Sequence, residues 1–434
     1  MAKEIFTSNV MGVFRQVSDT AARYGACLQL VRILGPRWSY VAGEKPSSAG
    51  VSPVARVVIH DGAGLVIYNP SKIPDVDREV IIESMKSSFA DENVFKEDEL
   101  HIPQIVKILS SNDDRADAVL FSRADSVRKK YMGDEVHLRG IVEFSNFCAK
   151  DCLYCGLRVS NKKLTRYKME EGEIIDSCRI AKDMGCGTVV LQSGEAAGND
   201  VDGLCRIVGK IKKDLALAVT VSIGELSKRE YLSLKSSGAD RYLLKFETSD
   251  RGLFKRLKPD GEYDKRFESL RILKDIGFQV GSGIMIGLPG QTPENIAEDI
   301  MMFKKLDLDM IGIGPFIPHP DTPLNKSGEG DLMLVLKVIA LTRIITRNAH
   351  IPATTAIGSL APDGRKKALQ CGANVIMPNM TPRKYRKLYQ LYPNKICTDE
   401  NPSDCVPCIG SMLSDIGRTI ARGHGHSLKR TASL

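Results

Sequence analysis

The chain has 434 residues, of which 43% are hydrophobic and 26% are charged. This composition is typical of a soluble globular protein, and the length allows one large domain with a smaller one. No apolar run approaches the roughly 18 residues that span a bilayer, and no signal peptide opens the chain, so we expect a cytoplasmic protein without membrane contact. The opening segment could resemble an organelle transit peptide, but Glu4, Asp19 and the lack of an arginine-rich run argue against import.

The formal net charge of +8 raises the question of nucleic-acid binding. Four cations follow the last acidic residue, Asp415, in a tail rich in Gly, Ser and His: Arg418, Arg422, Lys429 and Arg430. We expect this tail to be flexible and solvated. The rest of the chain has no basic stripe interleaved with aromatic residues, so the sequence predicts no nucleic-acid partner.

Residues 1–95 predict a small α+β module of unknown role. The elements expected there are a helix over 13–25, two strands around a Gly-Pro turn within 27–43, a hairpin over 55–69 and a closing helix over 77–92. Residues 96–135 then read as a linker with two helical segments, leading into a second domain.

Residues 136–395 alternate short β-like runs with amphipathic helical segments. The eight expected strands are 141–144, 188–194, 217–224, 240–247, 279–288, 309–317, 353–358 and 373–379. The stretches between them, such as 172–185 and 266–277, mostly end near a glycine, as helices often do. This pattern predicts the α/β class and a (β/α)8 TIM barrel. A doubly wound sheet is the alternative, but no G-x-G-x-x-G motif opens a helix after a strand.

Eleven cysteines without a secretory signal indicate metal or thiol chemistry rather than disulfides. Five stand alone and are expected to be small buried side chains: Cys27, Cys178, Cys186, Cys205 and Cys371. The other six form two trios, one after the first barrel strand (Cys148, Cys152, Cys155) and one after the last (Cys397, Cys405, Cys408).

The first trio lies in EFSNFCAKDCLYCGLR, residues 143–158. Three thiolates can hold three irons of a [4Fe–4S] cluster and leave the fourth iron open to the amino and carboxylate groups of S-adenosylmethionine. An electron from the cluster would then cleave the sulfonium to methionine and a 5′-deoxyadenosyl radical. A zinc knuckle with a borrowed ligand is the alternative. The C-x3-C-x2-C spacing, with Tyr154 before the last cysteine, at the C-terminal end of a barrel strand favours the radical chemistry.

The fourth expected strand predicts charge inside the barrel. With a two-residue period, one face holds Arg241, Leu243, Lys245 and Glu247, and the other holds Tyr242, Leu244 and Phe246. The apolar face should pack against helices, so the charged face points inward, where a charge without a partner is costly. We therefore expect an anionic ligand there, with an internal salt-bridge network as the alternative.

Several motifs together resemble the radical S-adenosylmethionine superfamily and, within it, the HydE family of [FeFe]-hydrogenase maturases. They are RGIVEFSNFCAKDCLYCGLR, TVVLQSGE, ADRYLLKFETSD, GLPGQT, GIGPFIPHPDTPL, IPATTA, CGANVIMPNMTP and YQLYPNKIC. The resemblance covers roughly residues 100–425 and says nothing about the N-terminal module.

The resemblance implies two sets of site residues. The cofactor set would contact S-adenosylmethionine and consists of Tyr154, Gln192, Ser193, Gly194, Glu195, Glu247 and Arg266. The substrate set consists of Arg241, Lys245, Thr354, Thr355, Met377, Tyr389 and Tyr392. Some relatives have arginine at the position of Lys245. The lysine can still hold an anion, but it lacks the bidentate fork of a guanidinium group. Strand geometry allows only one of the adjacent Thr354 and Thr355 to point fully inward.

The family's activity is implied in the same way. It would be an enzyme that acts with other hydrogenase maturases and an electron donor such as ferredoxin or flavodoxin. Its substrate would be a small organometallic iron complex that carries carbonyl, cyanide and cysteine, and the adenosyl radical would attack the cysteine-derived sulfur.

We expect the C-terminal segment 396–434 to consist of a cysteine loop, a helix and the basic tail. The second trio lies in this segment, where Asn, Asp and Pro predict a surface loop. Its three thiolates suffice for an auxiliary [2Fe–2S] or [4Fe–4S] cluster with an exogenous ligand. A vestigial or zinc-binding site is the alternative. The resemblance implies that this trio lies far from the barrel mouth and is not essential.

Two related enzymes and one other class compete with this interpretation. Biotin synthase carries further cluster-binding cysteines on its strands, and the strands expected here supply none in that pattern; methylornithine synthase lacks the C-terminal trio. A non-catalytic iron–sulfur scaffold would bind a cluster but produce no 5′-deoxyadenosine from S-adenosylmethionine and dithionite.

Overall fold

The computed structural model describes residues 28–32, 53–59, 63–68, 100–195, 200–400 and 402–429. The chain divides into two compact units. One comprises residues 1–100 with 112–119, and the other comprises residues 101–111 with 120–434.

The first unit contains a three-stranded antiparallel sheet in the order β1-β3-β2. Its strands are β1 (Leu28–Arg32), β2 (Pro53–Ile59) and β3 (Ala63–Tyr68). The β2–β3 pair confirms the expected hairpin, and β1 confirms the first strand of the 27–43 stretch. The helices expected over 13–25 and 77–92 and the second strand of 27–43 lie outside the described residues.

The second unit is built on a curled parallel sheet in the order β10-β4-β5-β6-β7-β8-β9. Its strands are β4 (Glu135–Ser145), β5 (Thr188–Ser193), β6 (Ala218–Ser222), β7 (Arg241–Leu243), β8 (Gln279–Ile286), β9 (Met310–Pro315) and β10 (Val375–Ile376). Most of their residues are buried, as expected for parallel strands covered on both faces. The α/β class and the TIM-barrel type of fold are confirmed.

One expected strand is wrong. Residues 355–358 of the predicted strand 353–358 belong instead to helix α12 (Thr355–Leu360). The extended chain lies just before it, where His350 bridges Met310 of β9 and Pro352 bridges Val375 of β10, so the two ends of the sheet are linked there. The prediction failed because threonine, here Thr354 and Thr355, is frequent both in strands and at the start of helices.

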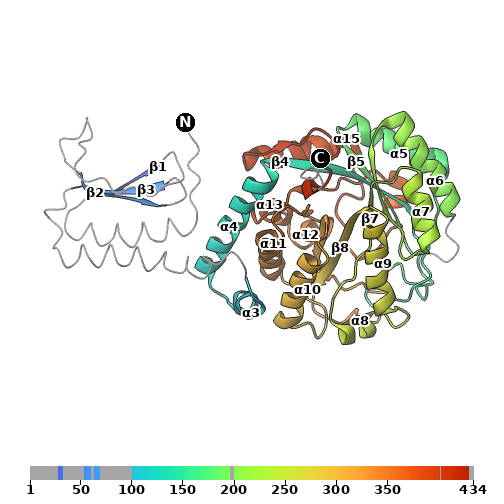
Figure 1. The fold of residues 1–434 in the computed structure, drawn as a ribbon, viewed down its shortest axis with the longest axis horizontal. Helices are drawn as coiled ribbons and strands as arrows, with labels where there is room; N and C mark the ends of the chain where they lie inside the picture. The colour runs from blue at the N-terminus through green and yellow to red at the C-terminus, as the bar shows by residue number, and fades with distance from the viewer. Residues whose placement is uncertain are drawn as a thin grey trace. The chain divides into compact units, whose positions relative to one another are not determined.

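Helices follow the strands and lie outside the sheet (Figure 1). Two of them, α3 (Ile102–Ser110) and α4 (Asp114–Met132), precede β4 as the sequence predicts. The others are α5 (Glu171–Asp183), α6 (Val201–Lys210), the π-helical turn η3 (Ile211–Leu215), α7 (Lys228–Ser236), α8 (Arg251–Leu257), α9 (Tyr263–Asp275), α10 (Pro293–Lys305), α11 (Leu332–Thr346), α13 (Gly364–Gln370), α14 (Arg383–Arg386) and α15 (Pro402–Asp415). Within the described residues, no helix is long and apolar enough to span a bilayer.

Local sequence explains where these helices begin. Ser227 and Glu230 form a capping box at α7, and Thr292 accepts the amide of Asn295 at α10, directly before Pro293. The apolar face of the β7 segment packs outward as predicted. The ring of Tyr242 lies 5.0 Å from that of Tyr231 on α7.

The described part of the C-terminal tail is not solvated as expected, because residues 419–427 pack against the N-terminal ends of the barrel strands. Strand β11 (Thr419–Ile420) pairs with the start of β4. Arg418 is buried and ion-pairs with Asp125, and Lys429 Nζ lies 2.7 Å from Asp307 Oδ1. Arg418 and Lys429, which were expected to be solvated, therefore form ion pairs with residues of the barrel unit.

Arg241 belongs to this packed end of the barrel and not to a substrate cavity. It is fully buried, and its guanidinium donates to Gln279 Oε1 at 3.1 Å and to the carbonyl oxygens of His424 and Gly425 at 2.7 and 2.9 Å. Arg241 is the first residue of β7, so it lies at the end of the barrel opposite the strands' C-terminal ends. The expectation that Arg241 binds substrate is therefore wrong.

Candidate active site

The loop that carries the first cysteine trio follows β4 and is held at both ends. Asn146 donates from Nδ2 to the carbonyl oxygens of Thr165 and Leu388, at 2.8 Å each. Arg166 donates back to the carbonyl oxygens of Asn146 and Leu157 at 2.6 and 2.9 Å. A charged side chain that binds several carbonyls fixes a loop without needing regular secondary structure. This loop is a fixed platform at the C-terminal edge of the sheet.

The three thiols of this loop are close enough to influence one another. Burial raises the pKa of Cys148, Cys152 and Cys155, and negative charge on the first two raises that of Cys155 further. Tyr154 hydrogen-bonds to the Cys152 thiol. Coordination to iron would reverse this tendency, since a metal ion deprotonates its thiol ligands.

Close packing beneath the loop leaves no room for extra atoms. A Cβ added at Gly194, directly after β5, would lie 2.3 Å from the Phe147 carbonyl oxygen and 2.8 Å from the Cβ of Cys148. Gly194 also donates its amide to Ser145 O at 3.2 Å, and Ser193 donates its hydroxyl to Gly194 O at 2.7 Å. The end of β5 therefore sets the position of the first cysteine.

The donors fit a cluster better than a single ion. Among the described residues, no three His, Cys, Asp or Glu side chains are grouped closely enough to hold one metal ion. In a [4Fe–4S] cluster, each thiolate binds a separate iron, so the ligands do not converge on one point. Three neighbouring half-buried thiols fit that requirement.

A network of charges lies beside the cysteine loop. Arg266 on α9 contacts Glu195 Oε2 through its NH2 group at 3.2 Å and Glu225 Oε1 through Nε at 2.7 Å, and Lys150 Nζ lies 3.4 Å from Glu195 Oε1. Burial would lower the pKa of Arg266, but the two glutamates outweigh it and raise the pKa. Burial would likewise raise the pKa of Glu195, but Arg266 and Lys150 lower it. Lys150, whose pKa the nearby glutamates raise, Glu195 and Arg266 therefore stay ionised at neutral pH.

Sequence reasoning missed Glu225 and Lys150. Glu225 ends the motif SIGE after β6, which matches QSGE (192–195) after β5, and Gln192 and Ser222 are paired in the two strands. Equivalent positions on neighbouring parallel strands bring Glu195 and Glu225 to the same edge. The repeated motif was the signal that could have found Glu225.

Glu247 has a strained backbone at the same edge. Its φ is +67°, in the left-handed region that costs a non-glycine residue about 1–2 kcal/mol. Its carboxylate Oε2 lies 3.0 Å from Lys245 Nζ, and its charge contributes to the raised pKa values of Tyr154 and Cys155. The inward charged face predicted for this segment thus contains an ion pair, the arrangement that the sequence analysis held as the alternative.

Two tyrosines of the expected substrate set lie near β4 and β5. Tyr389 is buried and hydrogen-bonds to Gln192, and Tyr392 hydrogen-bonds to Ser359. Burial raises the pKa of both phenols, and the carboxylate of Glu143 raises it further. The phenols therefore remain protonated and can donate hydrogen bonds.

Glu143 is another residue that the sequence analysis did not single out. Its buried carboxylate pairs with Lys395 and accepts from Asn379 Nδ2 at 3.2 Å. Glu143 lies near the C-terminal end of β4, and a glutamate within the otherwise apolar expected strand 141–144 was the available signal.

The second trio was expected in a surface loop, but two of its cysteines lie on a helix. Cys405 and Cys408 are on helix α15 and not in a loop, because Pro402 begins a helix there. Cys397, with φ +61°, lies before the helix, and its thiol hydrogen-bonds to that of Cys405. This hydrogen bond, aided by Arg365, lowers the pKa of Cys397.

This trio shares a pocket with residues of the expected substrate set. The pocket is lined by Thr355, Arg365, Met377, Pro378, Asn379, Cys397, Glu400, Cys405, Cys408 and Ile409. Thr355 and Met377 were expected in the substrate cavity, and Asn379 also contacts Glu143. Thr354 instead approaches the carbonyl oxygen of Ile313 at 3.4 Å. The trio thus lies at the C-terminal edge of the barrel, and the expectation of a site far from the barrel mouth is wrong.

Comparisons with known proteins agree with this geometry. The model of the Radical SAM superfamily matches residues 142–329. The [FeFe] hydrogenase maturase subunit HydE of Thermotoga maritima is 50% identical over 73% of this chain and 91% of that protein. The 3-methylornithine synthase of Methanosarcina acetivorans is 29% identical over 59% of this chain and 73% of that protein. The crystal structure of methylornithine synthase superposes with a TM-score of 0.67 at 26% identity, covering 76% of this chain and 97% of that one.

A cysteine loop after the first strand of a curled parallel sheet, within the matched superfamily region, defines the class as a radical S-adenosylmethionine enzyme. Half of the aligned residues are identical to a protein of which nine-tenths is covered, a level that the methylornithine synthases do not approach. The chain belongs to the HydE family of [FeFe]-hydrogenase maturases.

Proposed function

We propose that the protein works with other maturases in assembling the active-site cluster of an [FeFe]-hydrogenase. It would bind a small iron complex that carries carbonyl, cyanide and cysteine, and the adenosyl radical would attack the cysteine-derived sulfur. The observation that supports this best is the joint presence, at one barrel edge, of the three thiols and a charged network beside them.

The cofactor contacts follow from this arrangement. Cys148, Cys152 and Cys155 would hold the cluster, which supplies the electron that cleaves S-adenosylmethionine to methionine and the 5′-deoxyadenosyl radical. Glu247 would accept a hydrogen bond from the amino group of S-adenosylmethionine, and Arg266 would balance its carboxylate. Tyr154 and the end of β5 (192–195) would line the same pocket.

The substrate contacts lie deeper in the barrel. Lys245 would contribute the positive charge for an anionic complex, and Tyr389 and Tyr392 would donate hydrogen bonds from protonated phenols. Thr354, Thr355 and Met377 would complete the wall on the side of β10. A soft, carbonyl-bearing ligand suits the polarizable thioether of Met377.

The second trio would bind an auxiliary [2Fe–2S] or [4Fe–4S] cluster. Its three thiols, one of them with a lowered pKa, are suitable ligands, with a fourth supplied from outside the chain. Because this trio shares a pocket with Thr355 and Met377, its occupant would border the substrate wall.

Substitution of Lys245 by Met tests the substrate role. A charge-assisted hydrogen bond is worth roughly 1.5–3 kcal/mol, so its loss should lower the yield of an in vitro hydrogenase maturation assay by about tenfold or more. Cleavage of S-adenosylmethionine without substrate should change by no more than a few-fold. Lys305→Met, an exposed change on α10, is the control.

The Lys245–Glu247 ion pair gives this experiment a clear opposite outcome. If Lys245 serves only to hold Glu247, then cleavage and maturation will fall together. That result would contradict the substrate role. A maturation assay that does not depend on the wild-type protein at all would contradict the proposed function itself.

A further inference from the structure

One loop of the protein carries a local excess of positive charge. Residues 146–168, the cysteine loop, contain six basic side chains and one acidic, Asp151, in a chain with a net charge of +8. The basic residues are Lys150, Arg158, Lys162, Lys163, Arg166 and Lys168. Lys150, Arg158 and Lys163 have acidic partners, as the tail cations Arg418 and Lys429 do. The excess positive charge of the loop therefore comes from its other three cations.

Some of these cations have no charged partner in the described part of the chain. Lys162 and Lys168 are exposed and form no ion pair with another described residue, whereas Lys163 contacts Asp321 at 2.7 Å. The one acidic residue of the loop is neutralised internally, because Arg158 donates from Nε to Asp151 at 2.7 Å. The outward charge of the loop is therefore positive.

Two large apolar side chains are exposed on the same loop. Phe147, directly before Cys148, is 47% exposed, and Val159 is 39% exposed. Val159 donates its amide to Lys150 O at 2.9 Å, which places it against the middle of the loop. An aromatic side chain exposed among cations is typical of a protein-binding surface.

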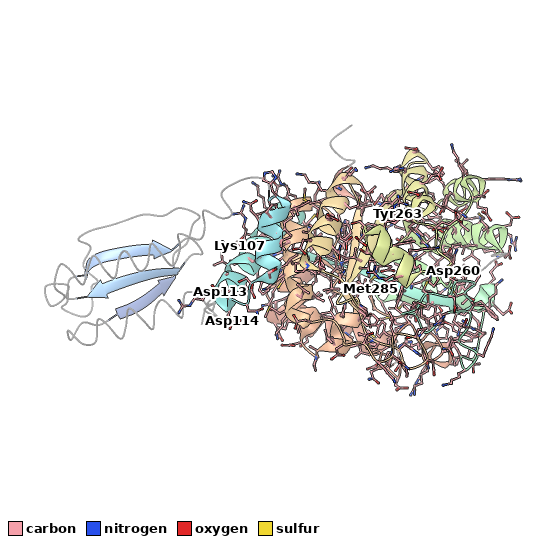
Figure 2. All side chains as sticks on the ribbon, turned by 90° about the horizontal axis from the view of Figure 1, so that it is seen from below. Lys107, Asp113, Asp114, Asp260, Tyr263 and Met285 are labelled. Carbon is pink, nitrogen blue, oxygen red and sulfur yellow. The ribbon has the colours of Figure 1, made fainter. Side chains whose placement is uncertain are left out.

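The positive surface continues onto α8. Leu153 donates its amide to Leu257 O at 2.9 Å, which joins the cysteine loop to the end of this helix. Lys255 and Arg256 on that helix are exposed. Asp260, an exposed acidic residue shortly after this helix (Figure 2), already accepts the Asp151 amide at 2.9 Å.

We propose that this surface docks a small acidic protein that carries a low-potential one-electron centre. We call it the cysteine-loop surface and define it by Phe147, Val159, Lys162, Lys168, Lys255 and Arg256. The carrier would be oxidised by one electron, which is the electron that reductive cleavage of S-adenosylmethionine consumes. The inference rests on the proposed function only in requiring that electron.

Position and charge both favour this occupant. Electron transfer slows steeply with distance, and Phe147 and Cys148 are adjacent, so a carrier seated on Phe147 approaches the first trio closely. Opposite charges on the two proteins steer them together and suppress wrong orientations. The complex needs to be only transient, which suits a patch of a few exposed side chains rather than a large apolar face.

The test compares two reductants on two matched double variants. Lys162→Glu with Lys168→Glu reverses two charges on the surface. Lys213→Glu with Lys305→Glu reverses two exposed lysines at the C-terminal ends of helical segments, on the opposite edge of the barrel. Reduced flavodoxin needs to dock, whereas dithionite is small and does not.

We expect the first variant to lose about tenfold or more of its flavodoxin-driven 5′-deoxyadenosine formation at low salt. With dithionite it should remain within about twofold of wild type. The control variant should keep both activities. Added salt should slow the flavodoxin reaction of the wild type, since it screens exposed charges, and leave that of the first variant nearly unchanged.

A binding measurement gives a second readout that does not need the cluster. The cluster-free wild-type chain should bind flavodoxin with a Kd that rises with salt, and the first variant should bind about tenfold more weakly. Equal flavodoxin-driven rates in the two double variants would overturn the proposal. So would a loss of maturation with normal flavodoxin-driven cleavage, which would assign the surface to another maturase. A wild type that produces no 5′-deoxyadenosine with dithionite would instead contradict the enzymatic function.

Discussion

At Gly194 the backbone of β5 touches the backbone of the cysteine loop. The φ of this glycine is ordinary, so the requirement is steric: the Phe147 carbonyl occupies the space of a Cβ. A single methyl group there would have to move Cys148. The position of the first trio therefore depends on a residue that performs no chemistry.

Replacing Gly194 with Ala should displace the cysteine loop. Misplacing a reacting group by about 1 Å can lower a rate by about a hundredfold, so we expect a loss of 5′-deoxyadenosine formation of up to that size, with less iron bound per chain. The control is Gly172→Ala on α5, where a Cβ meets nothing within 4 Å and should stabilise the helix. Normal iron content and rate in the Gly194 variant would show that the contact can relax.

For individual residues, the sequence predicted the chemical role of a side chain better than its place in the barrel. The cysteine spacing identified the first trio, because three thiols at that spacing have few other uses. The two-residue period of a strand assigned Arg241 to the inward face, but this period does not say at which end of the barrel a residue lies. Arg241 and Glu247 share a face and lie at opposite ends of it.

Among the elements, the C-terminal tail contains a histidine whose neutral form the folded structure requires. His426 Nδ1 lies 3.1 Å from Arg241 NH2 and 2.9 Å from Gln279 Nε2, both of them donors, so this nitrogen must accept and the ring must be neutral. Burial and then Arg241 lower the pKa of His426 to about 4. Burial and then Arg139 lower that of His137 to about 4 as well.

Stability should therefore depend on pH between about 6.5 and about 4. In this range the unfolded chain binds protons on these histidines and the folded chain does not, so stability rises with pH across the window and is lost as the pH falls through it. Replacing His426 with Gln keeps an acceptor for Arg241 and removes the titration. The variant's Tm should fall less than that of the wild type between pH 6.5 and 4.5, and an identical fall would contradict the assignment.

The two elements that were predicted wrongly are helices at the C-terminal edge, α12 with 6 residues and α15 with 14. Sequence patterns there are ambiguous: the stretch 353–358 is rich in threonine and alanine, and 402–415 contains two prolines, one of which begins the helix. Elements such as α9 and β8 were predicted correctly because a clear hydrophobic periodicity runs through each of them. Only tertiary contacts, such as the bridges at His350 and Pro352, decide the ambiguous segments.

Across the whole molecule, the barrel unites residues that are more than a hundred positions apart. The first trio, Glu195 and Arg266 meet at one edge because every parallel strand ends there. The alternation of strands and helices predicted that edge, but it could not show that the second trio lies on it too. Tertiary packing decides which helices and loops cover an edge of the barrel, and local sequence patterns do not predict this packing.

The most direct test is reductive cleavage of S-adenosylmethionine by anaerobically reconstituted protein with dithionite. Each of Cys148→Ser, Cys152→Ser and Cys155→Ser should abolish 5′-deoxyadenosine. The matched control, alanine at Cys397, Cys405 and Cys408 together, should lose about one cluster's iron and keep its cleavage rate, since only the first trio is next to the charged network. A serine variant of the first trio with the full wild-type rate would contradict the central claim, because the radical chemistry would then not depend on these thiols.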